Sequence, residues 1–146
     1  MTPGIDPSSA SPTTVAEATW PGFAAADLAL LRDALEVDIE TRADDGAPAH
    51  RTTIWVVVDP TDRVLVRTYR GPGSRWYREA VGNPVARLLV GDRAIEVRVS
   101  VADDDDRIAA CTDGLLRKYE GDPATPGMVR DEVLHTTLEL TPAGAG

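Results

Sequence analysis

The chain of 146 residues has a formal net charge of −9, and 42% of its residues are hydrophobic and 27% charged. These values describe one soluble globular domain with a buried core. The acidic balance argues against nucleic acid or an anionic membrane surface as the main partner. No apolar run approaches the roughly 20 residues that span a bilayer, and no basic-then-apolar signal begins the chain, so we expect a cytoplasmic protein.

Cysteine and histidine are too rare for several classes of site. Cys111 is the single cysteine, and His50 and His135 are the two histidines. A disulfide framework, a multi-cysteine metal site and a histidine-rich zinc centre are therefore excluded. The acidic run Asp103–Asp106 lacks the spaced ligands and the glycine of a calcium loop, and the sequence contains no nucleophile elbow, phosphate loop or dinucleotide fingerprint.

The chain divides into an arm, one domain and a short tail. Residues 1–19 are rich in Pro, Ser, Thr and Ala and predict a flexible arm, residues 20–142 form the single domain, and residues 143–146 are the tail. The helical spacing of apolar residues predicts a short helix over 23–34. Alternation of apolar and polar residues then predicts a strand over 35–41 with one wet face.

The next elements are two strands and a short helix. Residues 52–58 form a nearly continuous apolar run, and residues 64–69 resume the strand pattern after a turn. Ser74 is a candidate N-cap for a helix over 75–79, which Gly82–Pro84 ends by the usual preference for Gly, Asn and Pro beyond a helix.

The C-terminal half predicts a hairpin, a helix and a last strand. Strands over 85–90 and 94–101 flank a tight turn, a helix over 107–119 follows the acidic run, and a strand over 133–140 comes after a Pro/Gly loop. We expect one face of the hairpin's second strand to point inward through Ile95, Val97, Val99 and Val101. This order predicts an α+β protein of mainly antiparallel β structure, whose six strands form a barrel or a strongly bent sheet with two or three helices.

Arginines are concentrated in one stretch of this acidic chain. Residues 63–87 contain a single acid, Glu79, and six arginines: Arg63, Arg67, Arg70, Arg75, Arg78 and Arg87. A loop with Gly71, Gly73 and Ser74 before a helix start suits an anion, because glycines allow close backbone approach and guanidinium groups bind phosphate or carboxylate in two-point contacts. The alternative is that these arginines pair with acids on neighbouring strands, and the sequence leaves both interpretations open.

Aromatic residues cluster near the same stretch. Trp76 and Tyr77 directly follow the loop, and Trp55 and Tyr69 lie on the adjoining strands. Such side chains can enclose a planar ring, although Trp55 in its apolar strand is more readily explained as a core residue. A short helix does not easily bury both Trp76 and Tyr77, which favours a pocket role for them.

Four segments together resemble a known superfamily. They are residues 51–58 (Arg-Thr-Thr-Ile-Trp-Val-Val-Val), 66–71 (Val-Arg-Thr-Tyr-Arg-Gly), 74–77 (Ser-Arg-Trp-Tyr) and 82–85 (Gly-Asn-Pro-Val). This pattern resembles the flavin-binding split-barrel superfamily, which includes pyridoxamine-phosphate-oxidase-like proteins and the deazaflavin-dependent nitroreductases of actinobacteria. Residues 20–142 are similar, more closely, to a small bacterial family of unknown function allied to that superfamily.

The resemblance implies a six-stranded split β-barrel, commonly a homodimer, with a flavin-type ring in a groove that both subunits help form. The positions that match the phosphate-holding residues of such proteins are Arg51, Thr53, Arg67, Thr68, Ser74 and Arg75. Trp76 and Asn83–Pro84 look like elements of the nitroreductase branch. Two features depart from it: the lysine often found near the phosphate is absent, with Arg75 in its place, and the Gly-Gly turn reads Gly71-Pro72-Gly73.

The predicted function is a reductase-like protein that binds FMN or a deazaflavin coenzyme and acts on a small organic molecule, with the cofactor supplying the hydride chemistry. The expected cofactor-binding residues are Arg51, Thr53, Trp55, Arg67, Thr68, Arg70, Gly71, Ser74, Arg75, Trp76 and Asn83, and Tyr69 or Tyr77 is the expected proton donor. Two other functions remain open: a cofactor-free protein that binds a small molecule in the same groove, and a dimeric scaffold without chemistry.

Overall fold

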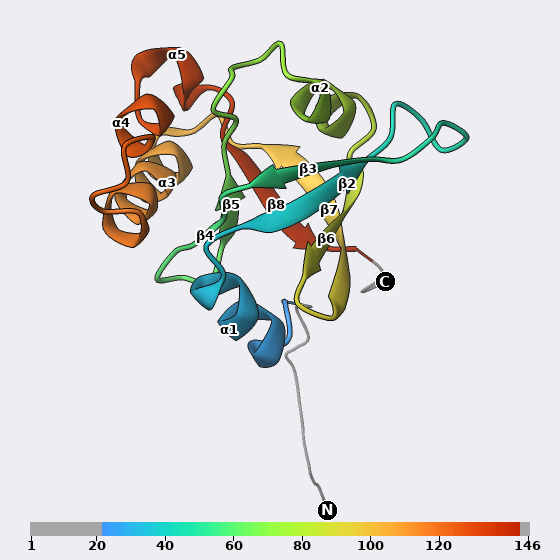
Figure 1. Ribbon diagram of the computed structural model, residues 1–146, viewed down its shortest axis with the longest axis horizontal. Coiled ribbons are helices and arrows are strands. Elements are labelled where there is room, and N and C mark those ends of the chain that lie inside the picture. Colours follow the sequence, from blue (N-terminus) through green and yellow to red (C-terminus); the bar gives the residue numbers. More distant parts are fainter. Residues whose placement is uncertain (1–21, 144–146) are drawn as a thin grey trace, which may run out of the picture.

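A computed structural model describes residues 22–143, so the predicted arm, Trp20 and most of the tail lie outside the described residues. Five helices and seven strands make up this part of the chain (Figure 1). The helices are α1 (Ala25–Asp33), α2 (Arg75–Gly82), α3 (Asp105–Lys118), α4 (Thr125–Met128) and α5 (Asp131–Leu134). The strands are β2 (Val37–Thr41), β3 (His50–Ile54), β4 (Val57–Val58), β5 (Val64–Val66), β6 (Val85–Val90), β7 (Arg93–Val101) and β8 (Leu138–Pro142).

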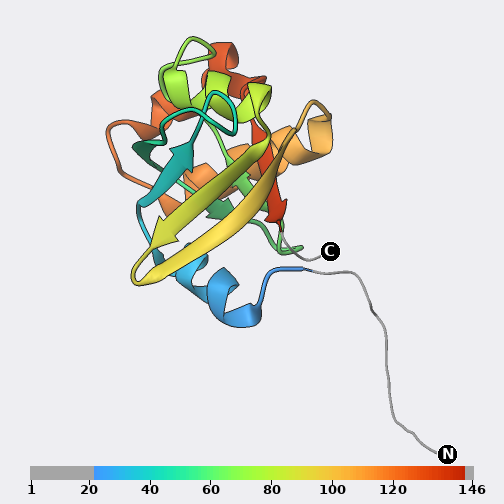
Figure 2. The ribbon, with the colours of Figure 1, turned by 90° about the vertical axis from the view of Figure 1, so that its right-hand side faces the viewer.

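All seven strands belong to one antiparallel sheet with the order β3-β2-β6-β7-β8-β5-β4. The two outermost strands of this order, β3 and β4, are joined by only Trp55 and Val56, so the sheet must curl until its two edges meet along one stretch of chain. The result is a split barrel, as predicted. The long β6–β7 hairpin, turned toward the viewer in Figure 2, forms its middle.

The apolar run over 52–58 is therefore two strands rather than the one that we predict from sequence. Its first part pairs with β2, with Val37 opposite Ile54, and its last part pairs with β5, with Val57 opposite Leu65. Local sequence cannot show this change of partner, because both halves are extended and apolar. The strand count rises from six to seven for this reason.

The end of the chain differs from the prediction in a second way. Residues 131–134 form α5 instead of opening the last strand, and β8 begins only at Leu138. The hydroxyls of Thr136 and Thr137 donate to the carbonyls of Val133 and Leu134 at 2.6 and 2.7 Å, and such local bonds compete with a strand ladder. The predicted Pro/Gly loop over 121–127 also contains most of α4, so the helices number five, not two or three.

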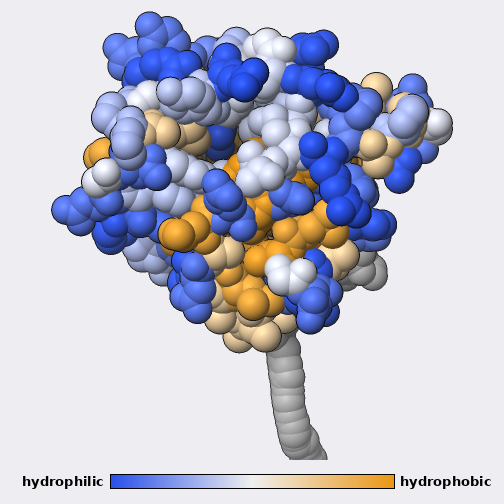
Figure 3. Space-filling view, in the orientation of Figure 1, coloured by the Kyte–Doolittle hydropathy of each residue, from blue (hydrophilic) through white to orange (hydrophobic). Residues whose placement is uncertain are grey.

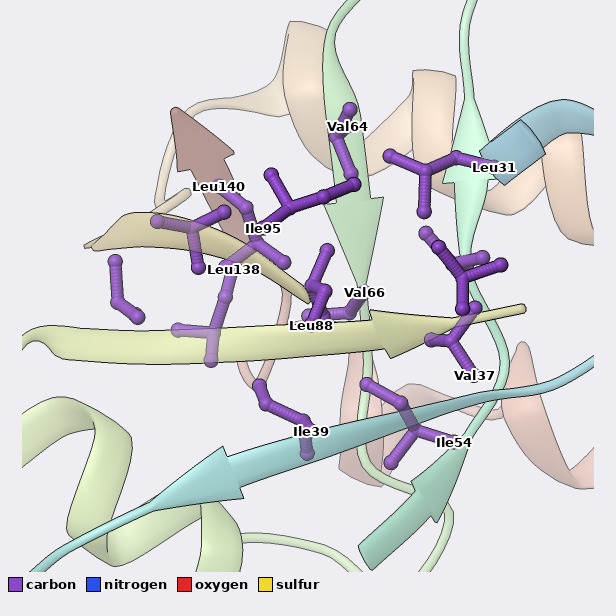
Figure 4. Packing of buried hydrophobic residues seen from close by; sticks show 14 of the residues in the cluster. Leu31, Val37, Ile39, Ile54, Val64, Val66, Leu88, Ile95, Leu138 and Leu140 are labelled. Carbon is purple, nitrogen blue, oxygen red and sulfur yellow. The ribbon is translucent and has the colours of Figure 1, made fainter. Parts of the chain in front are cut away.

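The barrel interior is the main core (Figure 4). The inward positions of β7 contribute Ile95, Val97 and Val99 to it, as predicted, whereas Val101 is 42% exposed at the end of that strand. A second, smaller cluster lies between the sheet and α3 and includes Val57, Leu65 and Cys111.

Helix α3 covers the barrel beside β4 and β5 and carries the second cluster. The Asp104 side chain accepts a hydrogen bond from the Arg107 amide and so caps the helix, as the acidic run predicts. Within residues 22–143, no helix combines the length and the apolar character that crossing a membrane requires.

Candidate functional site

A groove of about 970 Å³ opens between three segments of the chain. They are β3 with Trp55, the loop from β5 into α2, and the α4 region; in Figure 1 they surround the upper part of the face turned to the viewer, which Figure 3 shows as a surface. The lining residues are Glu36, Arg51, Thr52, Thr53, Ile54, Trp55, Arg67, Thr68, Tyr69, Arg70, Gly73, Ser74, Arg75, Trp76, Asp122, Ala124 and Met128. Ten of the thirteen residues that we predict for the site are among them.

One end of the groove is cationic and lies at the N-terminus of α2. Arg70 and Arg75 are exposed there and form no ion pair with any residue of the described chain. Ser74 occupies the N-cap position, but its hydroxyl bonds to that of Thr68 at 2.9 Å instead of capping the helix. The amides of Arg75, Trp76 and Tyr77 therefore have no acceptor among residues 22–143. Free amides, the helix dipole and two guanidinium groups together suit an anion.

Arg51 and Thr53 line the groove next to this end but have partners on β2. Arg51 Nε lies 3.3 Å from Glu40 Oε2, in an exposed pair, and the Thr53 hydroxyl donates to Asp38 at 2.7 Å. The Arg51 side chain is 62% exposed, and Glu40 also pairs with Arg87 at 3.7 Å, so Arg51 can turn to a ligand without leaving Glu40 unpaired. Among the six arginines of residues 63–87, Arg87 does pair with acids on neighbouring strands, and Arg63 pairs with Asp59 and Asp106. The other four, Arg67, Arg70, Arg75 and Arg78, form no ion pair with an acid of residues 22–143.

Arg67 lies in the wall of the groove and is only 1% exposed. Its guanidinium donates to the Thr137 and Thr112 hydroxyls and to the Met128 and Ile108 carbonyls, all at 2.9–3.0 Å. These bonds use four of the five N–H groups of an arginine, and all four acceptors are neutral. Burial accordingly lowers the pKa of Arg67 from its ordinary value. Arg67 therefore leaves an uncompensated positive charge beside the groove.

The other end of the groove is aromatic with an acidic rim. Trp55 lies there with its ring stacked on Tyr119 of the α3 C-terminus, at a centroid distance of 3.9 Å and an interplanar angle of 2°. Glu36 directly precedes the Val37–Ile54 pair and so lies beside Trp55, and the Asp122 amide donates to the Tyr119 carbonyl. Since Arg51 is four residues before Trp55 along nearly extended chain, the backbones of these two groove residues lie roughly 13 Å apart.

The α4 region forms the third wall and contacts Tyr69. Arg130 donates to the Tyr69 carbonyl at 2.8 Å, and its guanidinium lies 5.4 Å from the centre of the Tyr69 ring. A Cβ on Gly127 would come within 2.6 Å of the same ring, so only glycine allows this close approach. Tyr69, half of which is exposed, is thereby held against the groove.

Three predicted site residues do not line the groove. Gly71 is buried at φ +90°, and its carbonyl accepts from the Ser74 amide, so it shapes the loop instead. Asn83 follows the opposite end of α2, where its amide donates to the Glu79 carbonyl. Tyr77 packs against the main core, and burial raises the pKa of its hydroxyl.

Trp76 is 5% exposed within the core and still contributes to the groove wall. Of the two aromatic residues that this short helix was not expected to bury together, Trp76 is buried and Tyr77 is only partly buried. Sequence analysis also missed Glu36, Asp122 and Met128. Glu36 precedes β2, Asp122 lies in the loop after α3 and Met128 ends α4, and no local motif marks them.

Neither histidine lines the groove. His50 lies 3.0 Å from Glu79, which also accepts from the Thr41 hydroxyl, so this cluster ties α2 to the end of the sheet. In residues 22–143 no group of three or more His, Cys, Asp and Glu residues is placed to hold a metal ion.

Fold and groove together define an α+β split-barrel protein whose groove is cationic at one end and aromatic at the other. A family model matches residues 27–140, and the chain belongs to that family, DUF2255, which is described as an uncharacterized protein conserved in bacteria. A comparison with curated proteins found no match.

Several solved structures share the fold at low sequence identity. The heme storage protein HutZ from Vibrio cholerae is 11% identical with a TM-score of 0.58, covering 80% of this chain and 87% of its own. A protein from Listeria innocua assigned provisionally as a pyridoxamine 5′-phosphate oxidase is 15% identical with a TM-score of 0.56, covering 80% and 90%. An F420 reductase is 20% identical with a TM-score of 0.54, covering 80% and 92%. These similarities show the split-barrel fold.

Proposed function

We propose that this protein binds FMN or a deazaflavin coenzyme in the groove and acts as a reductase on a small organic molecule. The observation that carries the proposal is the cationic end, where two unpaired arginines meet three free helix amides. Such a site fits a phosphate group. Structural relatives named for F420 and for pyridoxamine phosphate oxidation support a cofactor of this class.

The charges of the groove orient such a ligand. Arg70 and Arg75 attract its phosphate to the α2 end, while Glu36 and Asp122 repel an anion from the Trp55 end. The ring then lies toward Trp55, where an aromatic surface is available. Arg67, buried beneath the wall, adds a positive potential without having to touch the ligand.

A bound flavin-type cofactor supplies the hydride chemistry, and the chain supplies binding, orientation and exclusion of water. Tyr69 is the proton donor that the proposal retains, because its ring lines the groove, whereas Tyr77 does not line it. A heme is a poorer fit despite the resemblance to HutZ, since both histidines, the most frequent heme ligands, lie away from the groove.

We also propose that the protein is a homodimer. Figure 3 shows apolar side chains gathered on the lower part of the face that carries the groove, over the region of α1, β2 and β4. Leu35, which lies between α1 and β2, is 65% exposed, and Leu30 is 37% exposed. A contiguous apolar surface of this kind marks an interaction site in soluble proteins. Light scattering should therefore give twice the monomer mass, and a Leu35→Glu variant should shift toward monomer.

The test of cofactor binding is a titration of the full chain with FMN and with F420, followed by absorbance and fluorescence. Replacing Arg70 and Arg75 together by Ala should weaken binding about 30-fold, which corresponds to about 1 kcal/mol for each lost charged hydrogen bond. The control is Arg98→Ala with Arg117→Ala, a pair of exposed arginines outside the groove that changes the net charge equally. Equal affinities of the two double variants would remove the arginine end from the site.

The alternative function is a cofactor-free protein that binds a small anionic molecule in the same groove. The acidic rim of Glu36 and Asp122 favours this alternative, because two carboxylates near the ring end disfavour a reduced, anionic flavin. Binding of small carboxylates or phosphates, together with no affinity for FMN or F420, would identify it.

A further inference from the structure

The bend between β3 and β4 is held by side chains of α3 rather than by a neighbouring strand. Val56 lies between the two ladders, and its amide donates to the Tyr119 hydroxyl at 3.3 Å. Its carbonyl accepts from Lys118 Nζ at 2.8 Å, and the same ammonium donates to the Leu31 carbonyl at 3.0 Å. A buried backbone group outside the ladder needs such a partner. The C-terminal turn of α3 therefore fixes the backbone directly after Trp55.

Tyr119 holds the side chain of Trp55 as well as the backbone beside it. Its ring lies parallel to the indole at 3.9 Å, and its hydroxyl donates to the Leu35 carbonyl at 2.7 Å. Tyr119 is only 5% exposed, and burial raises the pKa of its hydroxyl to about 12, so the hydroxyl stays protonated and can donate at neutral pH. One face of Trp55 is thus covered by the Tyr119 ring, which is held by its hydroxyl at one end and by the end of α3 at the other.

Because Tyr119 covers one face of the Trp55 indole, the opposite face is the one left for the groove. Trp55 is half-buried and lines the groove, so the indole is neither sealed in the core nor free to rotate. A rigid aromatic surface loses little rotamer entropy when a planar ring stacks on it, and the offset stack adds a favourable contact.

We infer that Tyr119 is a positioning residue that holds the Trp55 indole as a stacking surface for the planar ring of the ligand. This inference rests on the proposed function and deepens it, because it states where the ring lies and what orients it. The bound ring, Trp55 and Tyr119 form three layers. Tyr119 acts only through Trp55 and does not touch the ligand.

The readout is the fluorescence lifetime of bound FMN, because an indole in contact with a flavin ring quenches its emission by electron transfer. We expect a short lifetime in the wild-type protein and a longer one in Trp55→Leu. Tyr119→Leu should lengthen the lifetime and weaken FMN binding at least tenfold, whereas Tyr119→Phe, which keeps the ring, should stay within about threefold of the wild-type affinity. Leu116→Ala, on the exposed side of the same helix, is the control.

A second measurement separates this role from a general loss of structure. Inorganic phosphate reports on the arginine end alone, so the rise in melting temperature that it produces should be equal in Tyr119→Leu and wild type. If Tyr119→Leu does not fold, Trp55→Leu and Tyr119→Phe carry the test.

The outcomes distinguish the two proposals. If FMN binds the wild-type protein but its lifetime is the same in Trp55→Leu, the stacking surface and the role of Tyr119 are refuted while cofactor binding stands. The role of Tyr119 is also refuted if Tyr119→Leu keeps the wild-type lifetime and affinity. If neither FMN nor F420 binds, the proposed function fails, and this inference fails with it.

Discussion

The stack at Trp55 depends on how closely α3 approaches β4, and Gly114 sets that distance. A Cβ at Gly114 would lie 2.1 Å from Val57 Cγ1 and 3.2 Å from Val57 Cβ. Both residues are buried, Val57 at 2% exposure, so neither side chain nor backbone has room to move aside. Gly114→Ala must therefore push the helix away from the strand.

The magnitude follows from two opposing effects. Overpacking a well-packed core by one methyl group costs about 3 kcal/mol at the upper end of its usual range, and the higher helix propensity of Ala returns about 1 kcal/mol. A net loss of about 2 kcal/mol in the free energy of unfolding lowers the melting temperature of a domain of this size by about 8 °C. Because Tyr119 lies at the end of the same helix, the quenching of FMN by Trp55 should weaken as well.

The assay is thermal and urea unfolding of three variants with one control. Val57→Ala removes the two methyl groups that a Gly114 Cβ meets at 2.1 and 3.2 Å, so Gly114→Ala combined with Val57→Ala should be no less stable than Val57→Ala alone. Gly82→Ala is the control, since a Cβ there meets nothing within 4 Å. A melting temperature unchanged by Gly114→Ala, or losses that simply add in the double variant, would refute this reasoning.

Three further predictions concern titration, thiol reactivity and the groove wall. Burial lowers the pKa of Lys118 to about 8 from 10.5, so the unfolded state binds more protons than the folded state between these pH values. The free energy of unfolding of the wild type should therefore rise from pH 8 to 10.5 relative to that of Lys118→Met. A difference between the two proteins that stays constant over this range would contradict the prediction. Cys111 is fully buried, and burial raises its pKa to about 11, so a thiol reagent at pH 8 should label it only as fast as the protein unfolds. Gly127→Ala should displace the Tyr69 ring and weaken FMN binding several-fold, while Gly82→Ala, which lies outside the groove with open space around its Cβ, should not. Calorimetric titration of both variants measures the difference.

The barrel could be predicted from sequence because its hairpins carry their own signals. Alternation along β7 correctly identifies Ile95, Val97 and Val99 as inward, and the Gly91–Asp92 turn fixes the β6–β7 register. The division of the 52–58 run could not be predicted, because it depends on which strands lie at the two edges of the sheet. Trp55, the residue at that division, is consequently neither a plain core residue nor a loop residue.

The site was predictable only where one stretch of sequence supplies it. The loop from Arg67 to Trp76 contributes much of the groove, and its arginines stand out in an acidic chain. The same signal cannot separate Arg67 from Arg70, since residue type and local charge are alike. Position along the chain does separate them: Arg67 directly follows β5 and shares the face of Leu65, which α3 covers, whereas Arg70 lies in the loop beyond the strand. A sequence shows this position but not that a helix covers the face.

The burial of Arg67 also bears on the proposal that a protein of net charge −9 binds an anion here. Four neutral oxygens satisfy most of its N–H groups but none of its charge, and no carboxylate of residues 22–143 pairs with it. A charge in a poorly solvated wall is weakly screened, so its field reaches the groove more effectively than the exposed acids elsewhere reach it. Arg70 and Arg75 then add contacts at the point where that field is already positive. The phosphate affinity that we propose for this groove would accordingly depend on the buried wall as much as on the exposed side chains.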